Sequence, residues 1–473
     1  MISGATAGHP NTWIVIRRDK MKYKRSFFNI KFDETDTEVW LYNTLSNAML
    51  ALDKNAYEIY ENSLETLQKE KPLIFNNLIK HGLLVDKNLN EFDLVKYLYW
   101  MNKFDTTTLN LTLVVTKLCN FDCVYCFEKK ENKKLTQRDI ERILKFMEKQ
   151  LPGRKNLSIG WFGGEPLLEI PLILDLSSKI RSITEKHKVN LTQYMSTNGY
   201  FLTAENFFAL YNAGITGYDI TIDGPKEQHD KLRPLLGGLG TYDKIISNLI
   251  SISDEYSNIL KEEKALITIR VNLTHENLPI IKDWLENSFP EELKSTVKIY
   301  FAMVAGGGEK ESPANYILNM DNFLLSPLKD TYMLLEISKF ALDLGYNLQF
   351  SLKPSYVNCG AEAEGSYIIL PDSKIAKCPV IMNVIGELDN EGNILITDLP
   401  SYVKWMTKDP FRYTGTFEEC KTCPMLPICG GGCTKVYFNT NNKGCRIFKD
   451  SLNEYLKIIR DIRIKKVHNN SPN

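Results

Sequence analysis

The residues of this sequence best suited to chemistry are ten cysteines, which fall into two groups. The first group is a loop of the form Cys119-x3-Cys123-x2-Cys126. Three closely spaced thiolates can bind three irons of a [4Fe–4S] cluster and leave the fourth iron open. A structural zinc site would need a fourth ligand, which no nearby His or Cys supplies. The loop therefore predicts an iron–sulfur cluster with a free coordination position.

Three further stretches place polar residues directly after apolar runs. They are Gly163-Gly164-Glu165-Pro166, Ser196-Thr197-Asn198-Gly199, and Asp223-Gly224-Pro225, which leads to His229-Asp230 and Arg233. Each has a simpler interpretation alone: a glycine pair forms a turn, Ser-Thr-Asn caps a helix, and a lone histidine is often a hydrogen-bonded structural residue. Their order behind the cysteine loop favours one shared site.

Together the four stretches resemble the radical S-adenosylmethionine (SAM) superfamily, including the loop Cys119-Asn120-Phe121-Asp122-Cys123-Val124-Tyr125-Cys126. The resemblance implies that a [4Fe–4S] cluster binds SAM and cleaves it reductively to a 5′-deoxyadenosyl radical. It also implies the SAM contacts: Gly163, Gly164 and Glu165 at the methionine amine, Ser196 and Asn198 at the ribose and carboxylate, Arg233 at the carboxylate, and Tyr125 near the adenine. No residue stands out as a catalytic acid or base.

The second group of cysteines resembles the seven-cysteine SPASM domain of radical SAM peptide maturases. By the family's pattern, one auxiliary [4Fe–4S] cluster is held by Cys420, Cys423, Cys429 and Cys445, and another by Cys359, Cys378 and Cys433. Structural zinc is the alternative, since Cys-x2-Cys pairs also bind zinc. Asp372-Ser373 stands where the family commonly has Asp-Gly.

The second auxiliary cluster lacks a fourth cysteine. Relatives that mature sulfatases carry one shortly after the first, but the stretch from Gly360 to Gly365 has none. The open iron could bind a substrate thiolate, water, or a side chain such as Glu362 or Glu364.

Apolar strands alternating with helices must position these loops. Alternation of this kind predicts a parallel sheet with right-handed crossovers, here a partial (β/α)6 TIM-like barrel whose chemistry lies at the carboxyl ends of the strands. The predicted strands are Leu109–Val115, Leu157–Trp161, Thr192–Met195, Tyr218–Ile222, Ile267–Leu273 and Val297–Met303. The predicted helices are Leu135–Gln150, Leu172–His187, Ala204–Ala213, Tyr242–Tyr256 and Leu278–Asn287.

The predicted organisation is an α/β chain of five segments: an N-terminal winged-helix-like α+β module (1–104), the barrel (105–310), a bridging helix (311–354), the cysteine-rich domain (355–450) and a C-terminal helix with a tail (451–473). In the module, strands are expected at Trp13–Arg17, Phe27–Phe32 and Gly82–Val85, and helices at Ala51–Lys69, Leu73–His81 and Leu94–Lys103. Ser326 and Pro327 would begin the bridging helix. The module resembles leader-peptide recognition elements of ribosomal peptide maturases, although it could be a plain extension of the barrel.

Composition limits the partners and the cellular location that we expect. The 473 residues include 58 basic and 58 acidic ones, so nucleic acid and anionic membranes are not expected partners. The start shows no secretory signal, and no apolar run approaches the ~20 residues of a membrane span. Clustered thiols without an export signal indicate metal ligation rather than disulfides, and a cytoplasmic location.

The expected function is a radical SAM enzyme that crosslinks a ribosomally made precursor peptide with a leader sequence, most simply through a cysteine thioether. A flavodoxin- or ferredoxin-type reductant would supply electrons. Carbon–carbon crosslinking and formylglycine formation, as in sulfatase maturation, remain alternatives, with a zinc-containing peptide-binding protein as a more distant one.

Overall fold

The computed structural model describes residues 22–126, 128–274, 277–303, 331–350, 352–357, 359–380, 382–411, 415–434 and 451–469. The chain forms two compact units. The first contains Met1–Lys103, Phe350–Asn358 and Asp409–Asn473, and the second contains Phe104–Gln349 and Cys359–Lys408. The predicted segment 355–450 therefore contributes to both units. The proposed helix start at Ser326 and Pro327, the strand at Trp13–Arg17 and Cys445 lie outside the described residues.

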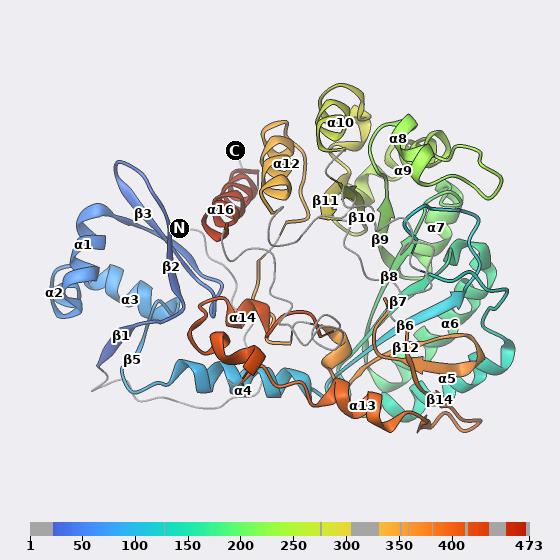
Figure 1. The fold of residues 1–473 in the computed structure, drawn as a ribbon, viewed down its shortest axis with the longest axis horizontal. Coiled ribbons are helices and arrows are strands. Elements are labelled where there is room, and N and C mark those ends of the chain that lie inside the picture. Colours follow the sequence, from blue (N-terminus) through green and yellow to red (C-terminus); the bar gives the residue numbers. More distant parts are fainter. Residues whose placement is uncertain are drawn as a thin grey trace. The chain divides into compact units, whose positions relative to one another are not determined.

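Six parallel strands form the centre of the second unit, in the spatial order β11-β10-β9-β8-β7-β6 (Figure 1). Because each strand lies beside the next one along the chain, with helices in most crossovers, the predicted α/β barrel-like fold is confirmed. The strands are β6 (Thr108–Thr116), β7 (Asn156–Gly163), β8 (Asn190–Thr197), β9 (Ile215–Thr221), β10 (Leu266–Leu273) and β11 (Val297–Met303). The helices are α5 (Gln137–Gln150), α6 (Ile170–His187), α7 (Ala204–Asn212), α8 (Lys226–Leu232), α9 (Tyr242–Lys261), α10 (Leu278–Asp283) and α12 (Thr331–Asp343).

Alternate residues of these strands pack against the helices. On β7, Leu157, Ile159 and Trp161 are fully buried, as period-two alternation requires for residues on one face. Gln193 of β8 accepts a hydrogen bond from the Trp161 indole and from Ser177 of α6, each at 3.1 Å. The odd-numbered positions of β7 and β8 therefore face the helices, and the even-numbered positions face the other side of the sheet.

Four short strands that were not predicted from the sequence extend the sheet beyond β6. The strand β12 (Ser366–Ile369) pairs in parallel with β6, and β13 (Lys374–Ala376), β14 (Val384–Leu388) and β15 (Ile394–Ile396) follow antiparallel before α13 (Leu399–Met406). An apolar cluster supports the extension, formed by Val114, Ile368, Leu370 and Ala376. These strands escaped prediction because strands of three to five residues carry almost no periodic signal.

The turn before β13 departs from the expected glycine. Asp372 and Ser373 both have positive φ angles, 62° and 55°, in the left-handed region that non-glycine residues occupy at a cost of about 1–2 kcal/mol. The Ser373 hydroxyl donates to the buried carboxylate of Asp139 on α5, 2.5 Å away. This bond helps to hold a turn for which glycine would be unstrained.

The first unit contains two small sheets. In one, the strands β2 (Asn29–Glu34), β3 (Glu38–Asn43) and β4 (Met49–Asp53) are antiparallel in that order; in the other, β1 (Tyr23–Arg25) pairs with β5 (Leu84–Asp86). The helices are α1 (Lys54–Asn62), α2 (Leu64–Glu70), α3 (Pro72–Lys80), α4 (Glu91–Lys103), α14 (Leu426–Cys429) and α16 (Leu452–Asn469). The helices α1, α2 and α3 follow the three-stranded sheet along the chain, and the winged-helix-like assignment of this module stays a prediction.

One predicted helix of this unit is wrong. The sequence favoured a single helix from Ala51 to Lys69, but residues up to Asp53 form β4. Asp53 caps α1 by accepting from Ala56 N, and Ser63 caps α2 by accepting from Thr66 N. Each cap favours a helix start at its own position over one continuous helix. At Asp53, the pairing of Ala51 with Trp40 also holds the preceding residues in a strand.

Candidate functional site

The cysteine loop, residues 119–126, follows β6 and is fixed by the segment 232–236. An antiparallel bridge pairs Phe121 with Leu235. Backbone hydrogen bonds join Asp122 N to Pro234 O (2.8 Å), Val124 N to Leu232 O (3.0 Å) and Leu236 N to Asn120 O (2.8 Å). The loop is therefore held as an added strand-like segment. The sequence did not predict this clamp, since backbone pairing leaves no side-chain signature.

The glycine pair after β7 allows the chain to pass directly against this loop. A Cβ on Gly163, whose φ is +145°, would lie 2.2 Å from Thr116 O, and a Cβ on Gly164 would lie 2.3 Å from Leu118 O. Both clashing atoms belong to the backbone, so neither can move aside alone. Gly164 N and Glu165 N donate to those same two carbonyls, at 3.0 and 2.8 Å. Glycine is thus required here by close approach, which goes beyond the simple turn considered from sequence.

Glu165 has a fully buried carboxylate beside the cysteine loop. It accepts hydrogen bonds from Thr197 Oγ1 at 2.6 Å, Asn198 N at 2.7 Å and Leu167 N at 2.9 Å. Burial raises its pKa, although these donors favour the charged form. A buried carboxylate oriented in this way suits a ligand ammonium group.

Asn198 connects Glu165 to the cysteines. Its backbone binds Glu165, while its side-chain Nδ2 donates to Asn120 Oδ1 at 2.8 Å and lies 3.9 Å from Cys119 Sγ. Ser196, half-buried, precedes it on β8. The structure therefore brings together predicted residues from the cysteine loop, from the Gly163–Pro166 stretch and from the Ser196–Gly199 stretch.

A second network links the loop to the strands β9 and β10. The Tyr125 hydroxyl donates to Asp223 and accepts from Arg233 Nη1 at 2.8 Å. Asn272 donates from Nδ2 to the Tyr125 oxygen at 3.2 Å and to Asp223 Oδ1 at 3.1 Å. Burial raises the pKa of Asp223. Burial also lowers the pKa of Arg233, but this is outweighed by the nearby Cys123, Tyr125 and Asp223, which raise it.

Asn272 was missed by the sequence analysis. The available signal was a polar residue near the carboxyl end of an apolar parallel strand, the position from which barrels present functional groups.

His229 has a structural role. Its Nδ1 accepts from Asp223 N at 3.2 Å, and its Nε2 lies 3.1 Å from Thr241 Oγ1. Burial lowers its pKa to about 3, so the ring stays neutral. Asp230 accepts from Thr241 N and Tyr242 N and fixes the same loop.

The donor set of the loop fits an iron–sulfur cluster with a bound ligand. Burial raises the pKa of Cys119 to about 12 and also raises those of Cys123 and Cys126, so these thiols need a nearby cation to ionise. Asn120 Nδ2 and Arg233 Nε are buried without a hydrogen-bond partner, which indicates a missing acceptor. Among the residues that the structure describes, no three His, Cys, Asp or Glu side chains are grouped closely enough to hold a metal ion.

The other cysteines are distributed over both units. Cys359 and Cys378 belong to the second unit, and Cys420, Cys423, Cys429 and Cys433 to the first. All nine cysteines in the described ranges are free thiols.

Buried lysines fix the loop that begins at Cys359. Lys408 Nζ lies 2.7 Å from Glu362 Oε1, and neither side chain is exposed. Lys377, next to Cys378, donates to Ala363 O and Ser366 O, each at 2.6 Å. Glu362, one of the two carboxylates considered as a cluster ligand, is therefore engaged by a cation within the fold. Glu364 is exposed.

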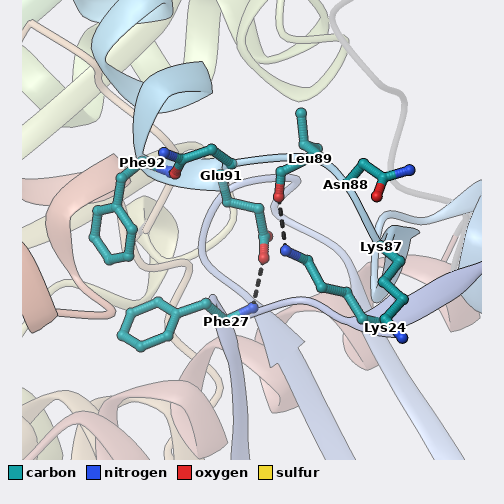
Figure 2. A pocket seen from close by; sticks show the side chains of 8 residues that line it. Lys24, Phe27, Lys87, Asn88, Leu89, Glu91 and Phe92 are labelled. Atoms are coloured by element: carbon teal, nitrogen blue, oxygen red, sulfur yellow. Dashed lines mark hydrogen bonds between the residues drawn. The ribbon is translucent and has the colours of Figure 1, made fainter.

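A pocket of about 350 Å³ lies in the first unit between the start of α4 and the segment around Phe27. Figure 2 shows two hydrogen bonds among its lining residues: Glu91 accepts from Phe27 N at 2.8 Å, and Lys24 donates to Leu89 O at 2.7 Å. These bonds join β1 and the segment after it to the start of α4 and the residues before it.

Residues 113–277, which hold the cysteine loop, Glu165, Asn198 and Arg233, match the radical SAM superfamily. The second unit thus carries a radical SAM domain. In the described part of the chain, no helix is both long and apolar enough to cross a membrane.

Comparisons with individual proteins agree with this class. The chain is 27% identical over 339 residues to the AdoMet-dependent heme synthase of Oleidesulfovibrio alaskensis, covering 67% of this chain and 80% of that protein. It is 25% identical over 445 residues to the radical SAM cyclopropyl synthase TigE of Paramaledivibacter caminithermalis, covering 85% and 83%. The structure of native anSMEcpe with bound AdoMet and Kp18Cys peptide has a TM-score of 0.52 and 17% identity and covers 76% and 99%, which shows a shared fold.

Proposed function

We propose that this enzyme forms an intramolecular crosslink in a ribosomally made precursor peptide, most simply a cysteine thioether. The observation that carries the proposal is the contact-linked set of Cys119, Asn198 and Glu165 beside Arg233, a built site for an amino acid ligand with an ammonium and a carboxylate. Cys119, Cys123 and Cys126 would hold the [4Fe–4S] cluster. The cluster and SAM would supply a hydrogen-abstracting radical, with electrons from a flavodoxin- or ferredoxin-type donor in the cytoplasm.

The chain's own residues would prepare SAM for this reaction. Glu165 would accept the methionine ammonium, because its carboxylate is buried and oriented by three donors. Arg233 would bind the carboxylate through its unpartnered Nε. Gly163 and Gly164 bring that part of the site against the loop, and Ser196 and Tyr125 would border the nucleoside.

The three-stranded sheet of the first unit supports a leader-binding role. One edge strand, β2, is covered by α16, where Arg460 and Lys457 form ion pairs with Asp33. The other edge strand, β4, pairs with β3 and with no other strand of the described residues. An extended peptide can add to such an edge through main-chain hydrogen bonds. We therefore assign the leader to the edge of β4.

The proposed thioether depends on the second cysteine group. Cys420, Cys423, Cys429 and Cys445 would bind one auxiliary [4Fe–4S] cluster, and Cys359, Cys378 and Cys433 the other. The ion pair of Glu362 with Lys408 supports an external fourth ligand, because diverting Glu362 to iron would leave the buried Lys408 charge without that partner. A substrate cysteine thiolate suits this position.

Carbon–carbon ring formation is the second candidate. It is favoured by the similarity to a cyclopropyl synthase over 85% of this chain. Both ring closures remove two hydrogens from the peptide, but only a thioether consumes a cysteine thiol. Alkylation of the product with iodoacetamide therefore separates them, and a hydrazide probe reports a formylglycine aldehyde instead.

Anaerobic reconstitution tests the proposal. Three clusters predict about twelve irons per chain, and C119A should abolish 5′-deoxyadenosine formation while about eight irons remain. Undiminished SAM cleavage by C119A, or zinc in place of iron, would overturn it.

A further inference from the structure

The inner face of the sheet in the second unit is lined by exposed polar and aromatic residues. Tyr218 of β9 packs on Phe207 of α7, with ring centroids 5.3 Å apart, so the neighbouring Gly217 and Asp219 face away from that helix. Tyr194 of β8 and Tyr300 of β11 are 43% and 42% exposed, and Asp219 and Arg270 of β10 are also exposed. The interior of a barrel is ordinarily filled with branched apolar side chains. Here, instead, these four side chains are polar or aromatic and exposed to solvent.

Asp219 lies beside the SAM site. Its register partner on β8 is Ser196, and its partner on β10 is Thr268. Adjacent strands are about 4.8 Å apart. A side chain bound at Asp219 would therefore lie next to the segment that borders SAM, within the region where a substrate must present its reacting group.

The Asp219 carboxylate has no hydrogen bond or ion pair with any described residue, although protein atoms surround it enough that burial raises its pKa. The positive charge of Arg270 lowers the pKa of Asp219. Arg270 is directed elsewhere: its Nε donates to Asn272 Oδ1 at 3.0 Å, and its guanidinium lies 5.9 Å from the centre of the Tyr300 ring. Asp219 is thus an exposed carboxylate on the inner face, with no direct partner in the part of the chain that the structure describes.

Two glycines lie on the same inner face as this carboxylate, Gly160 on β7 and Gly217 on β9. A Cβ on Gly160 of β7 would lie 2.6 Å from the Tyr194 ring, so that ring extends across Gly160. Gly217, opposite Tyr194 on β9, leaves bare backbone two residues before Asp219. Position 217, between the Tyr194 side chain on β8 and Asp219 on β9, therefore carries no side chain on this inner face. An aromatic side chain and a carboxylate together favour a cation.

We propose that Asp219, Gly217 and Tyr194 form a subsite for a basic side chain, lysine or arginine, of the core peptide. This assignment rests on the proposed peptide substrate. It specifies which kind of residue is held beside the SAM site, and it predicts that charge, rather than size alone, selects that residue.

Binding of small peptides to the SAM-loaded, anaerobically reconstituted full chain tests the subsite. The probes are acetyl-Gly-Lys-Gly-amide and its norleucine and glutamate counterparts, with affinities measured by ligand-observed NMR. The lysine peptide should bind at least ten times more tightly than the norleucine peptide. In D219N this ratio should fall to about one, and D219K should prefer the glutamate peptide.

Asp175→Asn, which changes an exposed carboxylate on α6, should keep the wild-type ratio and serves as the matched control. An unchanged lysine preference in D219N, or no preference in the wild type, overturns the subsite. A tenfold loss of SAM affinity in D219N with the peptide ratio intact overturns it as well, because Asp219 would then bind SAM. Failure of the wild type to cleave SAM would instead overturn the proposed function, so the two failures are distinguishable.

Discussion

Replacing Glu362 by glutamine would leave the Lys408 ammonium buried without its carboxylate partner. The two charged atoms are 2.7 Å apart and both side chains are fully buried. Coulomb's law gives an attraction of about 6 kcal/mol for unit charges at this distance and an effective dielectric constant of about 20. Much of it offsets the desolvation of both ions. The net expectation is that E362Q or K408M alone destabilises the local structure by about 3–5 kcal/mol, whereas E362L/K408M together is close to neutral.

Hydrogen exchange is the suitable assay, because a chain of two compact units need not unfold in one step. The free energy of opening would be measured by mass spectrometry for peptides that span 359–377 and 399–408. D175N, which breaks the exposed pair of Asp175 and Lys179, is the control and should cost less than about 1 kcal/mol. The reasoning is refuted if either single variant costs less than 1 kcal/mol, or if the double variant is as unstable as the two singles combined.

Three further outcomes are expected. G164A should lose SAM binding in equilibrium dialysis because its Cβ would meet Leu118 O, whereas G153A, on an open turn, should retain it; equal affinities would contradict the close-approach argument. R233K should weaken SAM binding about tenfold or more, as expected when a charge-assisted hydrogen bond is lost, and an unchanged dissociation constant would exclude Arg233 from the site. His229 is neutral when folded, with a pKa of about 3, but titrates near 6.5 when unfolded. The unfolded state therefore binds more protons as pH falls from 6.5 toward 3, and stability should decrease by about 1.4 kcal/mol per pH unit in that window; H229Q should lack this contribution in denaturant titrations, and identical pH profiles would count against it.

Long elements with strong periodicity were predictable. All six barrel strands were expected within a few residues of their bounds, since buried parallel strands are nearly continuous apolar runs. The strands β12–β15 were not, because each is too short for its periodicity to register. The break at Ser63 was missed for a different reason, namely that a hydroxyl cap inside an amphipathic run competes with the helix without altering its apolar pattern.

Some residues of the candidate site could likewise be predicted from the sequence, and others could not. Cys119, Glu165, Asn198 and Arg233 were assigned from motif and position. Hydrogen bonds connect Asn198 to Glu165 and Cys119, and another connects Arg233 to Tyr125 of the cysteine loop. Asn272 was not assigned, because a single polar residue in an apolar strand has meaning only when its neighbours in space are known.

The sequence by itself determined the class of chemistry, since thiol spacing and the residues after each strand are local properties of the chain. Only the tertiary structure decided which groups are free to act. It showed that His229 and Glu362 are engaged within the fold and that Asp219 lies open beside Ser196. The physical reason is that a side chain's burial, charge and partners depend on strand register and packing, which join residues far apart in sequence.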